Sequence, residues 1–574
     1  MSGVKAPKDP EGRRPFFYVM RDKEISGSLQ PDGRAVQYIY EDMGRLTNSA
    51  QVTGNVTDPE MLALLKDTAG FRRLVHSIGV SVEMGDAGQE IAFVFQMYGK
   101  EDLLGGGTQI RGRLHGDGAE VRLYLEEQQW SDDDREPGQM LFVFERPELI
   151  ATASVRFYLN DGYEAPEVDE EAEIAFASDA YREMIARSLT DMGDTGRVLS
   201  AIRRAREGER VTLAYIGGSI TQGAGAVPIN SECYAYKSYR NFAALFGAGD
   251  NVRFVKAGVG GTPSELGMIR FDRDVLRDGR ETPDIVVVEF AVNDEGDETR
   301  GCCFESLVRK IWNLPNRPAV VLLFSVFADD SNLQDRLKVV GERYRLPMVS
   351  VKDAVVPQFR LRPEQGRVLS KNQYFYDMFH PTNVGHTIMA DCLTYFYEQA
   401  AGRTDTSGQT GATGTDWKND LPEPVIGADF ENVRLLDRKE QPEGTEIACG
   451  SFRFEDKQLQ CVEMDEALSC TPEFPYNWMY CGDKEEGEPF RMEIRCRALL
   501  LVFKDSGEVC AGKAEVFVDG EKKLVADPHI NGWIHCNAVI LIQEKTTKKH
   551  VVQIQMAAGD EKKEFTILGF GYVV

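Results

Sequence analysis

The hydrophobic pattern of the chain changes twice along its length. From Phe16 to about Glu164, short runs with partial apolar–polar alternation are separated by Gly, Asp and Asn, and the same pattern returns after residue 421. Between these segments, continuous apolar runs alternate with stretches of helical periodicity. Alternation is typical of antiparallel strands with one exposed face, whereas continuous apolar runs are typical of strands covered on both faces. The pattern therefore predicts an α/β unit flanked by two β-sandwiches.

The central segment contains five apolar runs with helical patterns between them. The first run, Val211–Ile216, ends in two glycines and a serine within VTLAYIGGSITQGAGA. The other four runs are Asn251–Val259, Pro283–Val292, Ala319–Phe327 and Pro347–Val351. Such runs predict a parallel sheet with helices on both faces, whose ligand cleft lies beyond the carboxyl ends of the strands. Two helical stretches, 178–193 and 196–208, precede the first run, and we expect them to dock between domains.

The outer segments are assigned from their strands and turns. In the N-terminal segment, a helix is predicted over Asp58–Val75, between β-type runs. In the C-terminal segment, the Asp-Gly turn in VDGEKK (Val518–Lys523) predicts a hairpin. We divide the chain into an N-terminal β-sandwich (16–175), an α/β domain (176–402, with a helical lead-in at 176–208), a Gly/Ser/Thr-rich linker (403–420) and a C-terminal β-sandwich (421–574). The first 15 residues are expected to be disordered.

Composition narrows the classes of function. No apolar stretch approaches the ~18 residues of a membrane span, and the N-terminus has no apolar leader, so we expect a cytoplasmic protein. The 11 cysteines are odd in number and lack metal-type spacing, which agrees with a reducing compartment. A net charge of −26 argues against nucleic acid and anionic membranes as partners. Self-association into a homo-oligomer stays open.

Candidate chemistry gathers at the predicted strand ends. Gly217 and Gly218 can take backbone angles barred to other residues, and this would hold the Ser219 hydroxyl exposed on a tight turn. After the second strand, AGVGGT offers the N–H of Gly261 without a Cβ in the way. After the third, AVND offers the side-chain amide of Asn293. Both groups could stabilise an oxyanion that forms at the serine.

A base for the serine is found in FYDMFHPTNVGH. Asp377 and His380 are three residues apart, so that both side chains can point the same way and the carboxylate can orient the imidazole. Pro381, with Thr382 or Asn383 as cap, predicts a final helix over 384–400. Taken singly, each motif also has a structural interpretation: a capping turn, a tight connection or a surface histidine.

Together, the four blocks GGSIT, AGVGGT, AVND and DMFHP resemble the SGNH hydrolases, or GDSL-type esterases, which carry Ser, Gly, Asn and His in this order. The resemblance covers about 211–400. It implies a flavodoxin-like three-layer α/β/α domain, with Ser219 as nucleophile, His380 as base and Asp377 as the residue that orients it. It also implies an oxyanion hole formed by the N–H groups of Ser219 and Gly261 and the Asn293 side chain, without a metal or another cofactor.

Three departures refine this resemblance: Gly218 replaces the Asp of the GDS form, Lys256 stands where Asn is frequent, and Ala291 replaces a Gly. They point to the GGSIT branch, which looks like carbohydrate O-acetyl esterases of gut bacteria with flanking, jelly-roll-like β-sandwich modules. There, cytoplasmic members deacetylate imported oligosaccharides.

The resemblance therefore implies a serine esterase that removes short acyl groups, acetyl foremost, from the hydroxyls of an acetylated oligosaccharide. Two alternatives stay open: a sugar O-acetyltransferase that uses the same site, and a glycan-binding scaffold without activity. Trp478 and Trp533 are candidates for sugar binding, although packing is the commoner role of such residues. The C-terminal sandwich could bind carbohydrate or shape the cleft.

Overall fold

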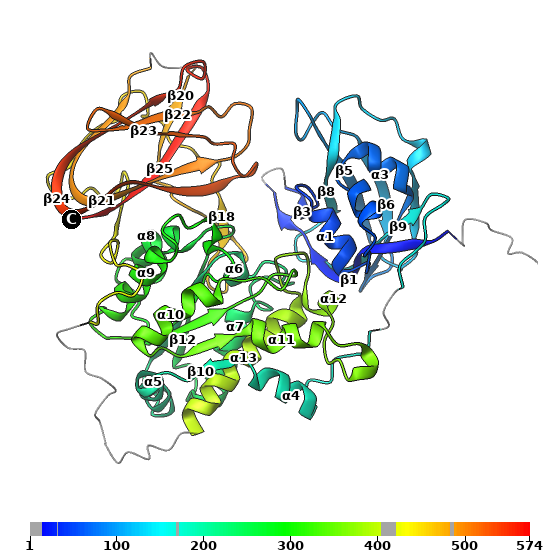
Figure 1. Ribbon diagram of the computed structural model, residues 1–574, viewed down its shortest axis with the longest axis horizontal. Coiled ribbons are helices and arrows are strands. Elements are labelled where there is room, and N and C mark those ends of the chain that lie inside the picture. The colour runs from blue at the N-terminus through cyan, green and yellow to red at the C-terminus, as the bar shows by residue number, and fades with distance from the viewer. Residues whose placement is uncertain (1–13, 31–32, 168–170, 403–420, 483–486) are drawn as a thin grey trace, which may run out of the picture.

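The computed structural model describes residues 14–30, 33–167, 171–402, 421–482 and 487–574 (Figure 1). The linker predicted at 403–420 and nearly all of the N-terminal tail lie outside the described residues. In Figure 1, the N-terminal part (blue) and the C-terminal part (orange to red) both stand on one side of a central α/β unit (green). No described helix combines the length and the apolar character that crossing a bilayer requires.

The α/β unit is built on a six-stranded sheet in the order β10-β15-β14-β13-β11-β12. The five predicted apolar runs form its five parallel strands: β11 (Val211–Gly217), β12 (Val252–Gly258), β13 (Ile285–Glu289), β14 (Ala319–Phe324) and β15 (Met348–Ser350). The order of these five is that of flavodoxin-like sheets, as the resemblance implied. Every residue of β11, β13, β14 and β15 is buried.

Two hydrophobic cores explain why these strands are apolar throughout. On β11, Leu213 and Tyr215 face one core, whereas Ala214 and Ile216 face the other. The first core is closed mainly by α4 (Asp179–Ala186), α5 (Gly196–Arg206), α7 (Tyr234–Phe246), α11 (Val351–Phe359) and α13 (Asn383–Gly402). The second is closed by α8 (Ser264–Asp274), α9 (Cys302–Trp312) and α10 (Gln334–Tyr344). The unit therefore has three layers.

The lead-in corrects one prediction. It contains α4 and α5, but between them lies β10 (Leu189–Asp191), which pairs antiparallel with β15. In addition, the hydroxyl of Tyr181 on α4 donates to Asp391 of α13 at 2.6 Å. The lead-in is thus an integral edge of the α/β unit and does not dock between domains. A strand of three residues is too short to show a period in the sequence.

The N-terminal part is a sandwich of two antiparallel sheets over one core. One sheet has the order β1-β9-β4-β7, with bounds Phe16–Ser26, Ile150–Leu159, Val75–Met84 and Val121–Tyr124. The other has the order β2-β3-β8-β5-β6, with bounds Ser28–Leu29, Ala35–Tyr40, Asp134–Phe144, Glu90–Gly99 and Gln109–His115. The single helix predicted near residue 60 is two helices, α2 (Pro59–Leu64) and α3 (Thr68–Leu74). They separate because the Asp67 side chain caps α3 by accepting the Gly70 N–H. A further helix, α1 (Arg45–Val52), was not predicted.

The C-terminal part is β-rich, as predicted. Its eight-stranded sheet comprises β16 (Arg434–Leu436), β17 (Glu446–Ala448), β20 (Trp478–Cys481), β21 (Phe490–Asp505), β22 (Ala514–Val518), β23 (Glu521–Ala526), β24 (His535–Met556) and β25 (Glu564–Val573). The predicted hairpin joins β22 to β23, with both Asp519 and Gly520 at positive φ, as a type I′ turn requires. A small pair, β18 (Cys461–Glu463) and β19 (Cys470–Pro472), carries a Cys461–Cys470 disulfide that the scattered cysteines did not indicate.

Candidate active site

The nucleophile turn follows β11 directly. Ser219 is the first residue of α6 (Ser219–Gln222), and its Oγ lies 2.9 Å from Nε2 of His380. Gly218 has a φ of −87° and a ψ of −146°, a combination that belongs neither to the helical nor to the strand region. Glycine is also needed for space: a Cβ on Gly218 would lie 2.2 Å from Oδ1 of Asn293.

Asp377 fixes the orientation of the histidine ring. Its Oδ2 lies 2.8 Å from Nδ1 of His380, while its Oδ1 accepts the backbone N–H groups of Phe379 and His380, both at 2.7 Å. Burial raises the pKa of Asp377, but the attraction to His380 and these hydrogen bonds outweigh burial and lower it below its ordinary value. A carboxylate held in this way leaves Nε2 directed at the serine hydroxyl.

The glycine and asparagine blocks meet the serine at the sheet edge. Gly217 at the end of β11 pairs with Gly258 of β12 and with Glu289 of β13, so that the following loops begin side by side. The amide of Asn293 lies against Gly218. Gly261 has a φ of +67°, and a Cβ there would lie 2.8 Å from Cζ2 of Trp533. The structure therefore joins Ser219, His380 and Asp377 by hydrogen bonds and places Asn293 against Gly218. Gly261 follows Gly260, at which a Cβ would lie 3.8 Å from the Cβ of Ser219.

A buried carboxyl lies behind the nucleophile. Glu289, fully buried at the end of β13, accepts hydrogen bonds from Thr221 of α6 at 3.2 Å and from Ser325. Burial raises its pKa to about 7, although both hydroxyl donors oppose the shift. Glu289 thus fastens the turn of Ser219 to two neighbouring strands.

The second histidine of the block is structural. His386 on α13 is fully buried; Nδ1 accepts the N–H of Tyr234 and Nε2 donates to the carbonyl of Ala224, both at 3.1 Å. Burial lowers its pKa to about 3, so the ring is neutral. It supports the segment that follows α6 without reaching Ser219. Nearby, Thr382 caps α13 by accepting the Gly385 N–H at 3.1 Å, as predicted.

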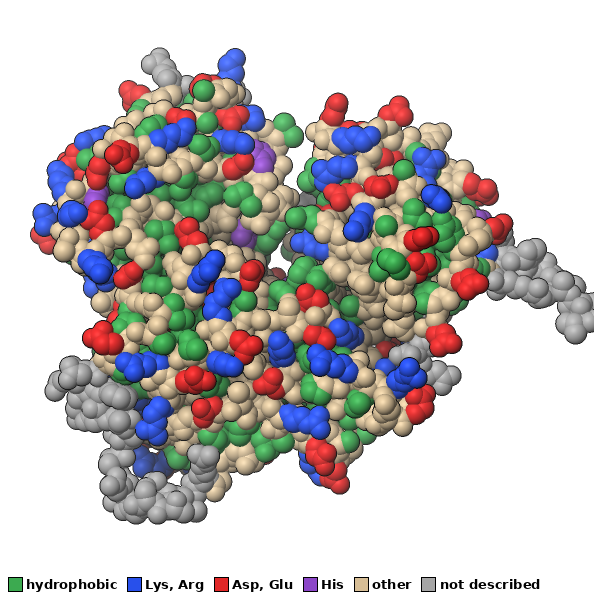
Figure 2. All heavy atoms as spheres, in the orientation of Figure 1, with side chains coloured by type: hydrophobic (Ala, Val, Ile, Leu, Met, Phe, Trp, Pro, Cys, Tyr) green, Lys and Arg blue, Asp and Glu red, His purple; other side chains and the backbone are tan. Residues whose placement is uncertain are grey.

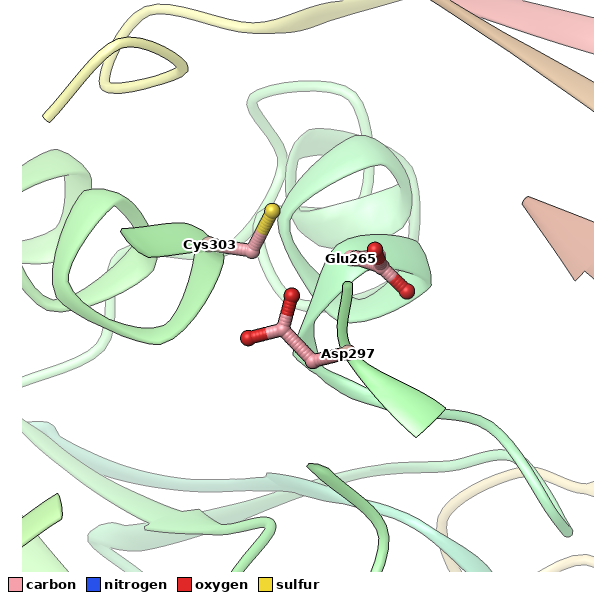
Figure 3. Close-up of side chains that lie close together, drawn as sticks. All are labelled: Glu265, Asp297 and Cys303. Carbon is pink, nitrogen blue, oxygen red and sulfur yellow. The ribbon is translucent and has the colours of Figure 1, made fainter. Parts of the chain in front are cut away.

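Among the described residues, one group of side chains has the donor types of a metal site. Glu265, Asp297 and Cys303 are buried, with donor atoms within 4.8 Å of one another (Figure 3). They do not fit a cation, because burial and the nearby carboxylates raise the pKa of Glu265 to about 9, and burial raises that of Cys303. Asp297 already accepts hydrogen bonds from the N–H groups of Thr299 and Gly301, at 2.8 and 2.6 Å.

The two tryptophans that were candidates for sugar binding differ in exposure. Trp478 is only 3% exposed and packs against Phe490 and Phe570, so it has no ring face for a sugar. Trp533 is 36% exposed and lies beside Gly261, with its ring centroid 4.6 Å from that of His535. Only Trp533 remains a candidate for substrate binding.

Contacts from the C-terminal part were missed by the sequence analysis. Gln460 donates through Nε2 to the carbonyl of Gly260 at 2.9 Å, and the N–H of Gly260 donates to Gln222 at 3.0 Å. Gln222 in turn donates to Glu463 on β18 at 2.9 Å. The loop that presents Gly261 is therefore held from both sides. No local motif marks Gln460 or Glu463.

Comparison with known proteins identifies the α/β unit. Residues 215–388 match the model of the GDSL-like lipase/acylhydrolase family. The α/β unit belongs to this family. Through this SGNH unit of the GDSL type, the protein is a carboxylic ester hydrolase. Among curated proteins, no significant match was found.

Two solved structures resemble the SGNH hydrolase. One is a two-domain esterase (CEX) active on acetylated mannans, with 23% identity and a TM-score of 0.56 over 68% of this chain and 99% of that one. The other is such an esterase co-crystallised with mannopentaose, with 24% identity and a TM-score of 0.55 over 68% of this chain and 98% of that one. At these identities the likeness shows a shared fold.

Proposed function

We propose that this SGNH hydrolase removes short acyl groups, acetyl foremost, from sugar hydroxyls through an acyl-enzyme on Ser219. The observation that carries the proposal is the continuous chain of hydrogen bonds from Asp377 through His380 to Ser219, with links of 2.8 and 2.9 Å. Such a chain serves to activate a serine hydroxyl as a nucleophile.

In the first half of the reaction, Ser219 Oγ attacks the ester carbonyl carbon while Nε2 of His380 takes the hydroxyl proton. The carbonyl oxygen becomes an oxyanion, which the N–H groups of Ser219 and Gly261 and the amide of Asn293 would stabilise. The C–O bond to the sugar then breaks, and the imidazolium of His380 returns the proton to the leaving sugar oxygen. In the second half, water attacks the carbonyl carbon of the acyl-enzyme while His380 takes its proton. The bond from this carbon to Ser219 Oγ then breaks, and the imidazolium returns the proton to Oγ, which releases the carboxylic acid and restores free Ser219.

Two observations support a carbohydrate substrate. The fold is shared with an esterase active on acetylated mannans, including a form that was crystallised with mannopentaose. In addition, the half-exposed ring of Trp533 lies beside Gly261, where it could stack on the sugar that carries the ester. Figure 2 shows a hollow between the N- and C-terminal parts above the α/β unit.

The test is acetate release from acetylated mannan, acetylated xylan and peracetylated simple sugars, with wild type beside Ser219→Ala. Release by wild type alone is the expected result, and the preferred substrate names the sugar. Equal release by Ser219→Ala would contradict the serine mechanism. A transfer product that grows with added acceptor sugar, at the expense of acetate, would instead favour the acetyltransferase.

A further inference from the structure

The N-terminal β-sandwich contacts the loop that carries Asp377 and His380 and accepts or donates several of its interactions. Lys23 extends from β1 into the interface with this loop and is only 3% exposed. Its Nζ donates to the backbone carbonyl of Phe375 at 2.8 Å and to that of Asn372. These carbonyls belong to the end of α12 (Lys371–Tyr374) and the residue after it, so Lys23 caps this short helix just before Asp377.

Other N-terminal side chains contact the same loop beyond that point. Tyr376 packs against the core of the N-terminal sandwich. The side-chain amide of Asn48 on α1 contacts the sulfur of Met378. The guanidinium of Arg45 stands 5.5 Å from the ring centroid of Phe379. Residues on both sides of Asp377 are therefore held by a part of the chain that lies more than 300 positions earlier, as the separation of 330 between Asn48 and Met378 shows.

Packing alone does not hold this interface. A cavity of about 500 Å³ lies along it, lined among others by Arg21, Lys23, Asn372 and Tyr376. Between α12 and α13 the loop has one isolated β-bridge, Phe375 to Pro381, flanked by bonds from the N–H of Tyr376 to the carbonyl of His380 at 2.7 Å and from the N–H of Thr382 to the carbonyl of Tyr374 at 2.8 Å. The α/β unit adds one backbone bond, from the N–H of Ala328 to the carbonyl of Met378 at 3.0 Å. Because close-packed atoms are missing on one side, directed hydrogen bonds must fix where the loop lies.

We infer that Lys23 is a positioning residue for the esterase: by holding residues 372–375 it keeps His380 in line with Ser219. This inference rests on the proposed function, since it assigns the N-terminal sandwich a part in the same site. Reaction rates depend steeply on such alignment, and displacing a reacting group by about 1 Å can lower the rate about 100-fold. Losing one of several supports should therefore lower kcat without changing the contacts that bind a small ester.

The test is Lys23→Met, which keeps the apolar stem and removes the donor. With p-nitrophenyl acetate, which is too small to reach the N-terminal sandwich from Ser219, we expect kcat to fall about tenfold while KM stays within about twofold. Lys23→Arg, which can still donate to both carbonyls, should recover part of the loss. The rate at which a fluorophosphonate modifies Ser219 should fall in parallel with kcat.

Lys310→Met is the matched control. Lys310 is a lysine whose side chain is only 10% exposed and whose Nζ donates to two backbone carbonyls, those of Met268 and Val433. It differs in pairing with Asp272 at 3.0 Å and in joining α9 to elements other than the loop of His380. We expect the kcat of Lys310→Met to stay within about twofold of wild type, provided that the two lysine variants have equal thermal stability. A Lys23→Met enzyme as active as Lys310→Met would overturn the positioning role. If Lys23→Met does not fold, Lys23→Gln and Asn48→Leu replace it, and wild-type kcat in both would overturn the role equally.

The Ser219→Ala enzyme separates the two proposals. If it is inactive while Lys23→Met keeps full kcat, the serine mechanism stands and only the positioning role fails. If Ser219→Ala turns over p-nitrophenyl acetate like wild type, the proposed function itself fails, whatever Lys23→Met does.

Discussion

Gly218 and Asn293 illustrate how one residue sets the identity of another at this site. A side chain at Gly218 is excluded by the amide of Asn293, whose Oδ1 would lie 2.2 Å from a Cβ. The sequence marked Gly218 as a turn glycine and as a departure from the GDS form. It did not indicate this steric role, because the neighbour that fills the space follows a different strand.

Asn293→Ala tests the amide directly. Removing one side-chain donor from an oxyanion hole costs about 10²–10³ in kcat in enzymes of this kind, and we expect the same loss here. The measurement is kcat on p-nitrophenyl acetate, where KM should change little. A wild-type kcat would show that Asn293 does not donate to the oxyanion.

Gly218→Ala tests the steric relation. The new methyl group must displace the Asn293 amide, so kcat should fall toward that of Asn293→Ala, by about 10- to 100-fold. The double variant, compared in a mutant cycle, should be no slower than Asn293→Ala alone, because its displaced group is already gone. Additive losses in the double variant would mean that Gly218 acts on something other than the amide.

At the scale of elements, the sequence pattern predicts best those strands that are covered by apolar side chains on both faces. β11 alternates between two apolar cores and so appears as an unbroken apolar run. β10 and α1 were not predicted because segments of three and eight residues are too short to show a clear hydrophobic period. Their positions depend on neighbours that are distant in the sequence. Glu289, on β13, has a structural role, because it accepts hydrogen bonds from Thr221 and Ser325.

Glu289 makes the stability of the α/β unit depend on pH. Its carboxyl has a pKa near 7 in the folded protein against an ordinary value of 4.5. The folded state therefore binds more protons between pH 4.5 and 7, and its free energy of unfolding falls as the pH rises through this window. A shift of this size corresponds to roughly 3 kcal/mol.

Glu289→Gln should remove this slope, because an amide does not titrate. The measurement is urea unfolding of both proteins at several pH values from 4.5 to 8, with the difference in unfolding free energy plotted against pH. From pH 4.5 to pH 8, we expect the unfolding free energy of the variant to rise relative to that of wild type by up to roughly 3 kcal/mol. Parallel curves would show that the carboxyl is already ionised in the folded protein at low pH.

At the scale of the whole molecule, the candidate site joins three parts of the chain. The α/β unit supplies the proposed catalytic residues, the C-terminal part places Trp533 beside Gly261, and the N-terminal part contacts the loop of His380. The five proposed site residues could be picked out because each belongs to a short motif. The supporting contacts could not, since Lys23 and Asn372 are 349 positions apart and no local pattern encodes how separate sheets pack.

Trp533→Ala tests whether the C-terminal part binds the sugar. If the ring stacks on the substrate, removing it should raise KM for an acetylated oligosaccharide about 3- to 10-fold, which corresponds to the binding free energy of one aromatic contact. The same variant should hydrolyse p-nitrophenyl acetate with kinetic constants close to wild type, because that ester does not need a sugar platform. An unchanged KM on the oligosaccharide would leave Trp533 without a part in binding.

During synthesis on the ribosome, the C-terminal sheet is the last of these parts that can form. β25 lies between β16 and β21 and supplies Phe565, Ile567 and Phe570 to the core beneath them. The sheet behind Trp533 is therefore incomplete until residue 573 has been made, whereas the α/β unit is complete by Gly402. A nascent chain thus completes the strands and helices that carry the proposed catalytic residues before it can form the sheet that places Trp533 beside Gly261.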